Sequence, residues 1–358
     1  MYLHYQQKYP DLYELLEKGR ALELDRSWDK DIPEFTPEDG PVATRKASSK
    51  IINSFAKKVP YLLGGSADLA ASTKTLMEDW GYFEKGNYQN RNIAWGIREH
   101  GMAAASSGIT LHGGLRAFAA TFFIFSDYAR PAIRLAALIK LPTIYVLTHD
   151  SIGLGGDGPT HQPVEHLASF RAMPNIFVFR PADANEVAYA WREVLERTEG
   201  PSMMVLTRQD VPIADRSKYA SAEGVMNGGY ILSKEKGETP DAILIGTGSE
   251  VSLALEAQEN LLDKNIDTRV VSLPCWELFK EQDETYINEV LPPKVKARTA
   301  VEAGTALGWK EWVGDTGTAV SVERFGSSAP YQDNFKNYGF TVENVIEHVK
   351  ETIETNKS

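Results

Sequence analysis

Residues 142–163 of the chain read PTIYVLTHDSIGLGGDGPTHQP, and the fold prediction starts from this stretch. The apolar run up to Thr148 predicts a buried strand, and the glycine-rich segment after it predicts a loop at the end of that strand. Open α/β sheets bind ligands at the carboxyl ends of their strands. The loop contains His149, Asp157 and His161, which a plain connection does not require. We therefore expect this loop to be functional.

Helices alternate with apolar runs on both sides of this stretch. The alternation predicts an α/β fold of two three-layer α/β/α domains with mostly parallel sheets, covered by helices on both faces. Residues 1–40 are rich in Asp and Pro and predict a linker remnant with one helix over 13–19. We expect a first domain over 41–220 and a second over 221–358. The expected strands are 61–63, 92–95, 115–120, 142–148, 175–179, 203–207, 242–245, 268–273, 300–302 and 319–322. The expected helices are 44–58, 99–108, 124–138, 184–197, 250–262 and 341–356.

The composition is that of a soluble globular protein, with 42% hydrophobic and 24% charged residues in a chain of 358. At roughly 150 residues per domain, this length allows about two or three domains. The net charge of 38 − 49 = −11 argues against nucleic acid as the main partner. A single cysteine, Cys275, excludes an internal disulfide and a thiolate zinc cluster. The first eight residues lack the apolar core of a signal peptide, and no apolar stretch reaches about 20 residues. We expect a cytoplasmic chain that does not contact a membrane.

Three further motifs have a simpler structural interpretation. Glu99 taken alone fits a carboxylate that complements the positive N-terminus of a helix. Residues 246–251, GTGSEV, lack the third glycine of a dinucleotide fingerprint. They predict a tight strand-to-helix turn, with Ser249 or Thr247 capping the helix. Residues 156–158, GDG, followed by Asn185, have the spacing of a thiamine-diphosphate metal motif. We expect Asn185 in the first turn of a helix, so we predict no metal site in this chain.

Aromatic and basic residues near the predicted strand ends leave two interpretations open. Phe118, Phe122 and Phe125 have near-helical spacing, which favours core packing, but aromatic residues between a strand and a helix also stack on flat ligands. Arg45 precedes the first predicted helix of the first domain, and Arg208 follows its last strand. Each arginine fits either a surface ion pair or a site for an anionic group.

Several segments taken together closely resemble transketolase, and the resemblance covers nearly the whole chain. It implies the pyrimidine-binding fold of thiamine-diphosphate enzymes, followed by the transketolase C-terminal domain. The N-terminal domain of that family, which binds the diphosphate and the metal, has no counterpart here, and the GDG segment aligns with a substrate loop instead. The matching segments are ATRKAS at 43–48, GGSADL at 64–69, REHGM at 98–102, the loop 149–163, LTRQ at 206–209, GSSAP at 326–330 and YGFT at 338–341.

The resemblance also implies roles for individual residues. Glu99 would hydrogen-bond the aminopyrimidine ring of thiamine diphosphate and promote its proton transfer. The other cofactor-binding residues would be Asp68, Phe122, Phe125 and Tyr128. The residues that hold the sugar phosphate would be Arg45, Ser72, His149 and Arg208. Asp157 and His161 would contact the hydroxyls of the donor ketose and assist proton transfer. The catalytic set implied by the resemblance is Glu99, His149, Asp157 and His161.

The implied reaction is transfer of a two-carbon ketol unit between sugar phosphates, with xylulose 5-phosphate as donor and ribose 5-phosphate as acceptor. Thiamine diphosphate with Mg²⁺ or Ca²⁺ is expected only if a partner supplies the missing domain. The expected partners are sugar phosphates, a second copy in a homodimer, and a separate diphosphate-binding subunit.

Two alternatives stay open at this point. One is cofactor-independent ketol transfer by this chain alone, with His149, His161 and Glu99 as acid–base groups. The other is a non-catalytic sugar-phosphate-binding or regulatory remnant. For this second alternative, the discriminating feature is the surface that a diphosphate-binding domain would cover. An apolar surface would favour a missing partner, and a polar one would favour a stand-alone protein.

Overall fold

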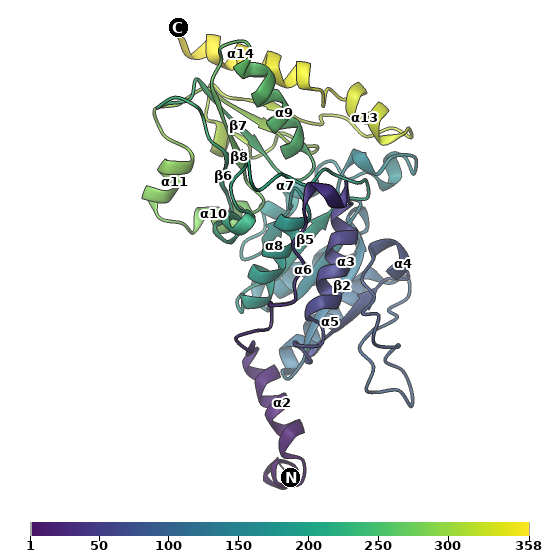
Figure 1. Ribbon diagram of the computed structural model, residues 1–358. Helices are drawn as coiled ribbons and strands as arrows, with labels where there is room; N and C mark the ends of the chain where they lie inside the picture. Colours follow the sequence, from purple (N-terminus) through teal and green to yellow (C-terminus); the bar gives the residue numbers. More distant parts are fainter. Residues whose placement is uncertain (1, 358) are drawn as a thin grey trace.

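The computed structural model describes residues 2–357, which form two α/β domains, each around a five-stranded sheet (Figure 1). The first sheet has the order β1-β2-β3-β5-β4, and all its strands are parallel. Its strands are β1 Leu62–Ser66, β2 Arg116–Phe122, β3 Ile144–Thr148, β4 Phe177–Phe179 and β5 Ser202–Leu206. The predicted α/β class with mostly parallel sheets is confirmed.

The second sheet has the order β10-β9-β7-β8-β6, and β6 alone is antiparallel to its neighbour. Its strands are β6 Tyr230–Ser233, β7 Ala242–Gly246, β8 Thr268–Ser272, β9 Arg298–Val301 and β10 Thr318–Val320. The antiparallel edge strand β6 was not predicted. Only alternate residues of this strand are buried, so it lacks the continuous apolar run that marks the central strands.

Helices cover both faces of the first sheet because the side chains of its strands alternate between two apolar clusters. Along β3, Ile144 and Val146 lie in one cluster, and Tyr145 and Leu147 lie in the other. The first cluster takes residues from α3 Thr44–Phe55 and α8 Ala184–Glu196. The second takes residues from α5 Glu99–His112, α6 Ser126–Leu138 and α7 His166–Arg171. This gives the three layers of the predicted architecture.

The second domain follows the same plan, and it shares the first apolar cluster. In β7, Leu244 lies in that shared cluster, whereas Ile243 and Ile245 face a separate cluster. The shared cluster includes Ile51 of the first domain and Val345 of the second. The helices on the shared face are α9 Glu250–Leu262 and α14 Val342–Lys357, and those contributing to the separate cluster are α10 Trp276–Lys280, α11 Glu284–Val290 and α12 Lys310–Val313.

The N-terminal segment forms two helices rather than the single predicted one. They are α1 Tyr2–Lys8 and α2 Pro10–Ala21, which project from the first domain (Figure 1). The chain then returns to the domain and buries Trp28, Ile32 and Phe35 in the shared cluster. The side chain of Asn185 accepts a hydrogen bond from the Phe35 amide at 3.0 Å and donates one to the Phe35 carbonyl at 2.7 Å. This asparagine therefore holds the N-terminal segment in place.

The predicted strand over residues 92–95 is wrong. Asn92 makes only isolated bridges with Gly64 and Tyr82. Its buried side chain donates hydrogen bonds to the carbonyls of Met77 at 2.9 Å and Trp80 at 2.6 Å, and these contacts hold a loop. The short helices α4 Ala70–Thr73, α7, α10 to α12 and α13 Tyr331–Asn337 were also not predicted. Within residues 2–357, no helix has the length and apolarity needed to cross a bilayer.

Candidate active site

Two histidines and two phenylalanines meet at the carboxyl edge of the first sheet. His149 follows β3 in a left-handed conformation with φ 66°, and its side chain is buried. Its ring lies 3.7 Å from the Phe122 ring between centroids, and its Nδ1 lies 2.8 Å from the Thr148 hydroxyl. The ring of His161, from the glycine-rich loop, lies 5.4 Å from the Phe125 ring. The structure thus brings together residues that are far apart in the sequence.

The aromatic residues divide between this edge and the core. Phe122 and Phe125 are nearly parallel, with an interplanar angle of 9° and centroids 5.8 Å apart. Tyr128 follows at 6.3 Å from Phe125 and is exposed. In contrast, Phe118 and Phe123 lie in the two apolar clusters. Core packing therefore accounts for Phe118, whereas Phe122, Phe125 and Tyr128 form a row of aromatic rings beside the histidines.

A reciprocal pair of threonines places the two arginines at the same edge. The Thr44 amide donates to the Thr207 hydroxyl at 2.9 Å, and the Thr207 amide donates to the Thr44 hydroxyl at 2.7 Å. The next residues in the chain are Arg45 and Arg208. Arg45 donates to the carbonyl of Ser72 at 2.5 Å, so Ser72 contacts it through its backbone.

The two guanidinium groups have no acidic partner. No ion pair of residues 2–357 involves Arg45 or Arg208, although Lys46 beside them pairs with Asp210. The interpretation of these arginines as surface ion pairs is therefore wrong. Burial and the neighbouring charge of Arg208 lower the pKa of Arg45. Two unpaired cations at a sheet edge are suited to bind an anion.

The same cations act on His149. Burial, together with the smaller effects of Arg45, Arg208 and His161, lowers the pKa of this imidazole to about 3. The ring is consequently neutral at physiological pH. An anion bound between the arginines would remove part of this electrostatic penalty.

The three candidate carboxylates stand apart from this group. Glu99 is the first residue of α5 and is only 8% exposed. No hydrogen bond or ion pair with another residue of the described chain involves its carboxylate, which lies at the positive N-terminus of α5. Asp68 follows β1 with φ 60°, and Asp157 is in the glycine-rich loop. Both are exposed, and the interactions of residues 2–357 include no direct contact between these side chains and the histidines or arginines.

Sequence reasoning missed Arg180, which lies directly behind this edge. It follows β4, is fully buried, and donates to Asp150 Oδ2 from Nε at 3.0 Å and from Nη2 at 2.7 Å. Asp150 is the neighbour of His149. The sequence signal that could have found it is an arginine at the end of a short apolar strand. An arginine in this position is expected to be buried, and a buried arginine requires an acidic partner.

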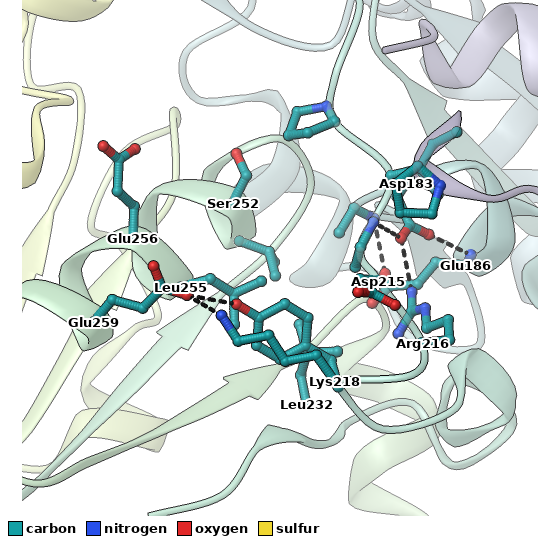
Figure 2. A pocket seen from close by; sticks show the side chains of 17 residues that line it. Asp183, Glu186, Asp215, Arg216, Lys218, Leu232, Ser252, Leu255, Glu256 and Glu259 are labelled. Atoms are coloured by element: carbon teal, nitrogen blue, oxygen red, sulfur yellow. Dashed lines mark hydrogen bonds and ion pairs between the residues drawn. The ribbon is translucent and has the colours of Figure 1, made fainter. Parts of the chain in front are cut away.

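Two other groups of polar residues have internal partners. A cavity of about 430 Å³ lies between the domains and is lined by none of the candidate residues (Figure 2). Its Asp183 accepts hydrogen bonds from the Glu186 amide at 2.8 Å and from Arg216 at 2.8 Å, and its Lys218 pairs with Glu259. These contacts are structural: those of Asp183 lie within the first domain, and the Lys218–Glu259 pair links its end to α9 of the second domain.

One cluster of the described residues has the composition of a metal site. Asp127, Glu165 and His166 offer ligand atoms within 4.8 Å of one another. However, Asp127 lies 3.2 Å from Nε2 of His166, and Glu165 lies 3.9 Å from Nδ1. Carboxylates on opposite ring nitrogens fit an imidazole ion pair better than a single ion, which one ring nitrogen would ligate.

Comparisons with known proteins agree along the chain. Residues 40–213 match the family described as transketolase, pyrimidine binding domain, and residues 228–341 match the transketolase-like TK C-terminal domain. A transketolase from Geobacillus stearothermophilus is 51% identical over 346 residues, covering 97% of this chain and 52% of the relative. The chain thus spans about half the length of most of the curated relatives it matches.

Solved structures give the same result. The crystal structure of a transketolase from Pichia stipitis in complex with sedoheptulose 7-phosphate has a TM-score of 0.93 and 40% identity, covering 99% of this chain and 52% of its own. A structure described as a split gene transketolase, inactive β4 tetramer, has a TM-score of 0.70 and 25% identity. It covers 88% of this chain and 99% of its own.

Proposed function

Since the chain belongs to the transketolase family, we propose that it carries the pyrimidine-binding and sugar-phosphate-binding half of a transketolase. The reaction is transfer of a two-carbon ketol unit from xylulose 5-phosphate to ribose 5-phosphate. The group of Arg45, His149, His161 and Arg208 carries the proposal. It combines two unpaired guanidinium groups with a neutral imidazole at the carboxyl edge of a parallel sheet. Such a group suits a phosphate ester.

Each residue of the group has a distinct task in this proposal. Arg45 and Arg208 bind the phosphate oxygens, with His149 and Ser72 completing the site. Arginine suits this task because its planar fork donates two parallel hydrogen bonds. Asp157 and His161, on the exposed side of the glycine-rich loop, contact the hydroxyls of the ketose and hold or move a proton there.

Two features of this chain fit the aminopyrimidine ring of thiamine diphosphate. Phe122, Phe125 and Tyr128 offer a row of aromatic rings, and Glu99 is a buried carboxylate with no partner in the described chain. A buried carboxylate without a partner is costly, so a ring nitrogen that shares a proton with Glu99 would satisfy it. Asp68 would complete the binding site. When bound with Mg²⁺ or Ca²⁺, the cofactor supplies the electron sink that carbon–carbon cleavage requires.

The exposed face of α5 and α6 supports a partner subunit. Leu111 of α5 and Leu135 and Leu138 of α6 are 65%, 55% and 62% exposed. Because α5 and α6 pack against each other, large exposed apolar side chains on both helices favour an interface over a stand-alone surface. We propose that this face binds a diphosphate-binding subunit within an assembly that also contains a second copy of this chain.

The split-gene relative, described as an inactive β4 tetramer, supports the need for a second kind of subunit. A cytoplasmic location is part of the same proposal. It is supported by the single cysteine, which is free and buried.

The test is a ketol-transfer assay with xylulose 5-phosphate and ribose 5-phosphate. The purified chain is assayed with and without thiamine diphosphate and Mg²⁺, and then with a separately produced diphosphate-binding domain of a related transketolase. We expect activity only when the domain, the cofactor and the metal are all present. In that mixture Glu99→Ala should abolish the activity, whereas Glu256→Ala, at an exposed position of α9, should not.

Other outcomes separate the alternatives. Activity of the chain without cofactor would contradict the proposal in favour of cofactor-independent transfer. Binding of sugar phosphate without activity in any mixture would indicate a non-catalytic binding protein. A chain that binds no sugar phosphate would contradict the assignment of the arginine and histidine residues.

A further inference from the structure

Three of the proposed substrate-binding residues are each followed directly by a buried polar residue. The pairs are His149–Asp150, His161–Gln162 and Arg208–Gln209, and the second members are 1%, 2% and 6% exposed. Burying a polar side chain costs free energy unless it forms hydrogen bonds. All three second members find their partners in the C-terminal domain, either directly or through one further side chain.

Asp150 is joined to the C-terminal domain through Arg180. The Arg180 guanidinium donates to Asp150 on one side, and on the other it donates to the carboxylate of Glu250 and to the Thr247 carbonyl at 2.9 Å. Burial alone would lower the pKa of Arg180, but the carboxylates of Glu250 and Asp150 raise it above its usual value. A buried charged bridge therefore runs from the neighbour of His149 to the first turn of α9.

Gln209 reaches the same carboxylate by a second route. Its Nε2 donates to the Ser249 hydroxyl at 3.2 Å, and that hydroxyl donates to Glu250 Oε1 at 2.5 Å. A Cβ atom on Gly153 would lie 2.6 Å from Gln209 Nε2, so the substrate loop packs closely on this amide. Glu250 is thus linked to the neighbours of both His149 and Arg208.

Gln162 is held by a different part of the C-terminal domain, the segment 326–334. Its Nε2 donates to the Ser327 carbonyl at 2.9 Å and to the Gly155 carbonyl at 3.0 Å. A Cβ atom on Gly326 would lie 1.6 Å from Gln162 Oε1, so this close approach requires glycine.

The same segment supports the glycine-rich loop at two more points. Ser328 donates to the Gly156 carbonyl at 2.6 Å, and Asn334 donates to the Ile152 carbonyl at 3.3 Å. Asp157 lies between the residues held in this way. The loop therefore rests on the C-terminal domain along most of its length.

We propose that the C-terminal domain positions the substrate-binding side chains of the first domain through two separate supports. The first is Glu250 with Ser249, which positions His149 and Arg208 for the phosphate. The second is the segment 326–334, which positions Asp157 and His161 for the ketose hydroxyls. Asp150, Gln162 and Gln209 are positioning residues, which act through their neighbours. The proposal rests on the proposed function, because it takes these side chains to bind a sugar phosphate.

The first support is tested by Ser249→Ala, which removes the partner of Gln209. Its matched control is Ser252→Ala in the first turn of α9, because the Ser252 hydroxyl donates to the Ser249 carbonyl, at 2.9 Å, and not to Gln209 or Glu250. Calorimetry measures the binding of inorganic phosphate and of xylulose 5-phosphate. We expect Ser249→Ala to raise the Kd of both probes about fivefold, the loss typical of one hydrogen bond, and Ser252→Ala to change neither.

The second support is tested by Ser328→Ala, at an exposed position where a loss of folding is not expected. Its control is Ser327→Ala, because the Ser327 hydroxyl contacts Tyr338 of its own domain. We expect Ser328→Ala to raise the Kd of xylulose 5-phosphate about fivefold and to leave the Kd of inorganic phosphate unchanged. Ser327→Ala should leave both unchanged.

Urea unfolding of each variant separates positioning from stability. A merely structural role would lower the free energy of unfolding and leave the affinity of the folded protein as in the wild type. That result for both test variants would overturn the proposal.

A wild-type chain that binds neither probe would instead contradict the proposed function. The proposal is then decided by the histidine ring signals in NMR spectra of the ligand-free chain. A shift of the His149 signal in Ser249→Ala but not in Ser252→Ala supports positioning, and the absence of any shift overturns it.

Discussion

The carboxyl edges of the two sheets occupy equivalent places in their domains but differ in what they face. After β3 the first sheet ends in the loop that starts at His149, which lies beside two unpaired arginines. After β7 the second sheet ends in the turn 246–249, and Arg180 of the first domain closes this turn. A Cβ atom on Gly248 would lie 2.6 Å from the Arg180 guanidinium carbon. The carboxyl edge of a parallel sheet is therefore a ligand site only where the rest of the fold leaves it open.

The charges of the two edges show the same difference. At the covered edge, Glu250 and Glu302 are buried and are paired with Arg180 and Arg171. At the open edge, the cations have no acidic partner within residues 2–357. Unpaired charge indicates a ligand site more directly than the position of an edge in the topology does.

Replacing Arg180 with Met should have the largest effect, because it uncovers the closed edge. The change leaves the carboxylates of Asp150 and Glu250 buried without their partner, so we expect the free energy of unfolding to fall by about 3–5 kcal/mol. Urea denaturation measures this value. Arg192→Met is the control, since Arg192 forms a partly exposed pair with Asp29 and its loss should cost at most about 1 kcal/mol. An equal fall in the free energy of unfolding of the two variants would contradict the difference between the covered and the open edge.

Replacing Arg208 with Met, at the open edge, should weaken phosphate binding and leave the stability nearly unchanged. A charged hydrogen bond contributes about 1.5–3 kcal/mol, so the Kd of inorganic phosphate should rise roughly 10- to 100-fold. The free energy of unfolding should change by less than about 0.5 kcal/mol, because the side chain is exposed. Exposed Arg26→Met controls for the loss of one positive charge. A large loss of stability with unchanged phosphate affinity would reverse the roles of the two edges.

His149 makes the open edge sensitive to acid. Its pKa is about 3 in the folded chain and about 6.5 in the unfolded chain, so below pH 6.5 protons bind mainly to the unfolded state. The stability from this group is complete above pH 6.5 and is lost as the pH falls toward 3. At pH 5 the loss is about 2 kcal/mol. Urea unfolding at pH 7 and pH 5 should show this loss in the wild type and not in His149→Gln, with His100→Gln as control. An identical pH dependence in His149→Gln would show that the imidazole is not buried between cations.

Two glycine variants, one at each edge, should give a still smaller difference in the free energy of unfolding. Gly248 has φ 57°, and a side chain there would meet Arg180, so Gly248→Ala should cost about 1–2 kcal/mol. Gly156 is in the glycine-rich loop of the open edge, and a Cβ atom there would meet nothing within 4 Å. Gly156→Ala should therefore change stability by less than about 0.5 kcal/mol. Thermal unfolding of the two variants side by side measures the contrast, and equal shifts in Tm would show that the turn at 246–249 is not closed.

Local sequence patterns were sufficient for most of the strands and for the loop at 149–163. Continuous apolar runs predicted the central strands. The helix predicted over 184–197 matches α8, which Asp183 caps by accepting a hydrogen bond from the Glu186 amide. The pattern was misleading at Asn92, where a polar residue binds a loop through its side chain. A run of four residues does not distinguish this arrangement from a strand.

The turn at 246–249 illustrates what local patterns omit. It joins β7 to α9 as predicted, but neither Ser249 nor Thr247 caps the helix. The Thr247 hydroxyl donates to Glu302 at 2.6 Å, and the Ser249 hydroxyl donates to Glu250. The left-handed conformation of Gly248 is matched to Arg180, which is 68 positions away in the sequence. Partners at such separations are set by the packing of the two domains, which no local pattern contains.

The apolar cluster shared by both domains affects how the chain unfolds. Val146 of the first sheet and Leu244 of the second lie in one uninterrupted cluster, so neither sheet loses its packing without exposing part of the other. Heating should therefore melt the two domains in a single cooperative transition. The two domains are separate segments of the sequence, but they unfold together as one cooperative unit.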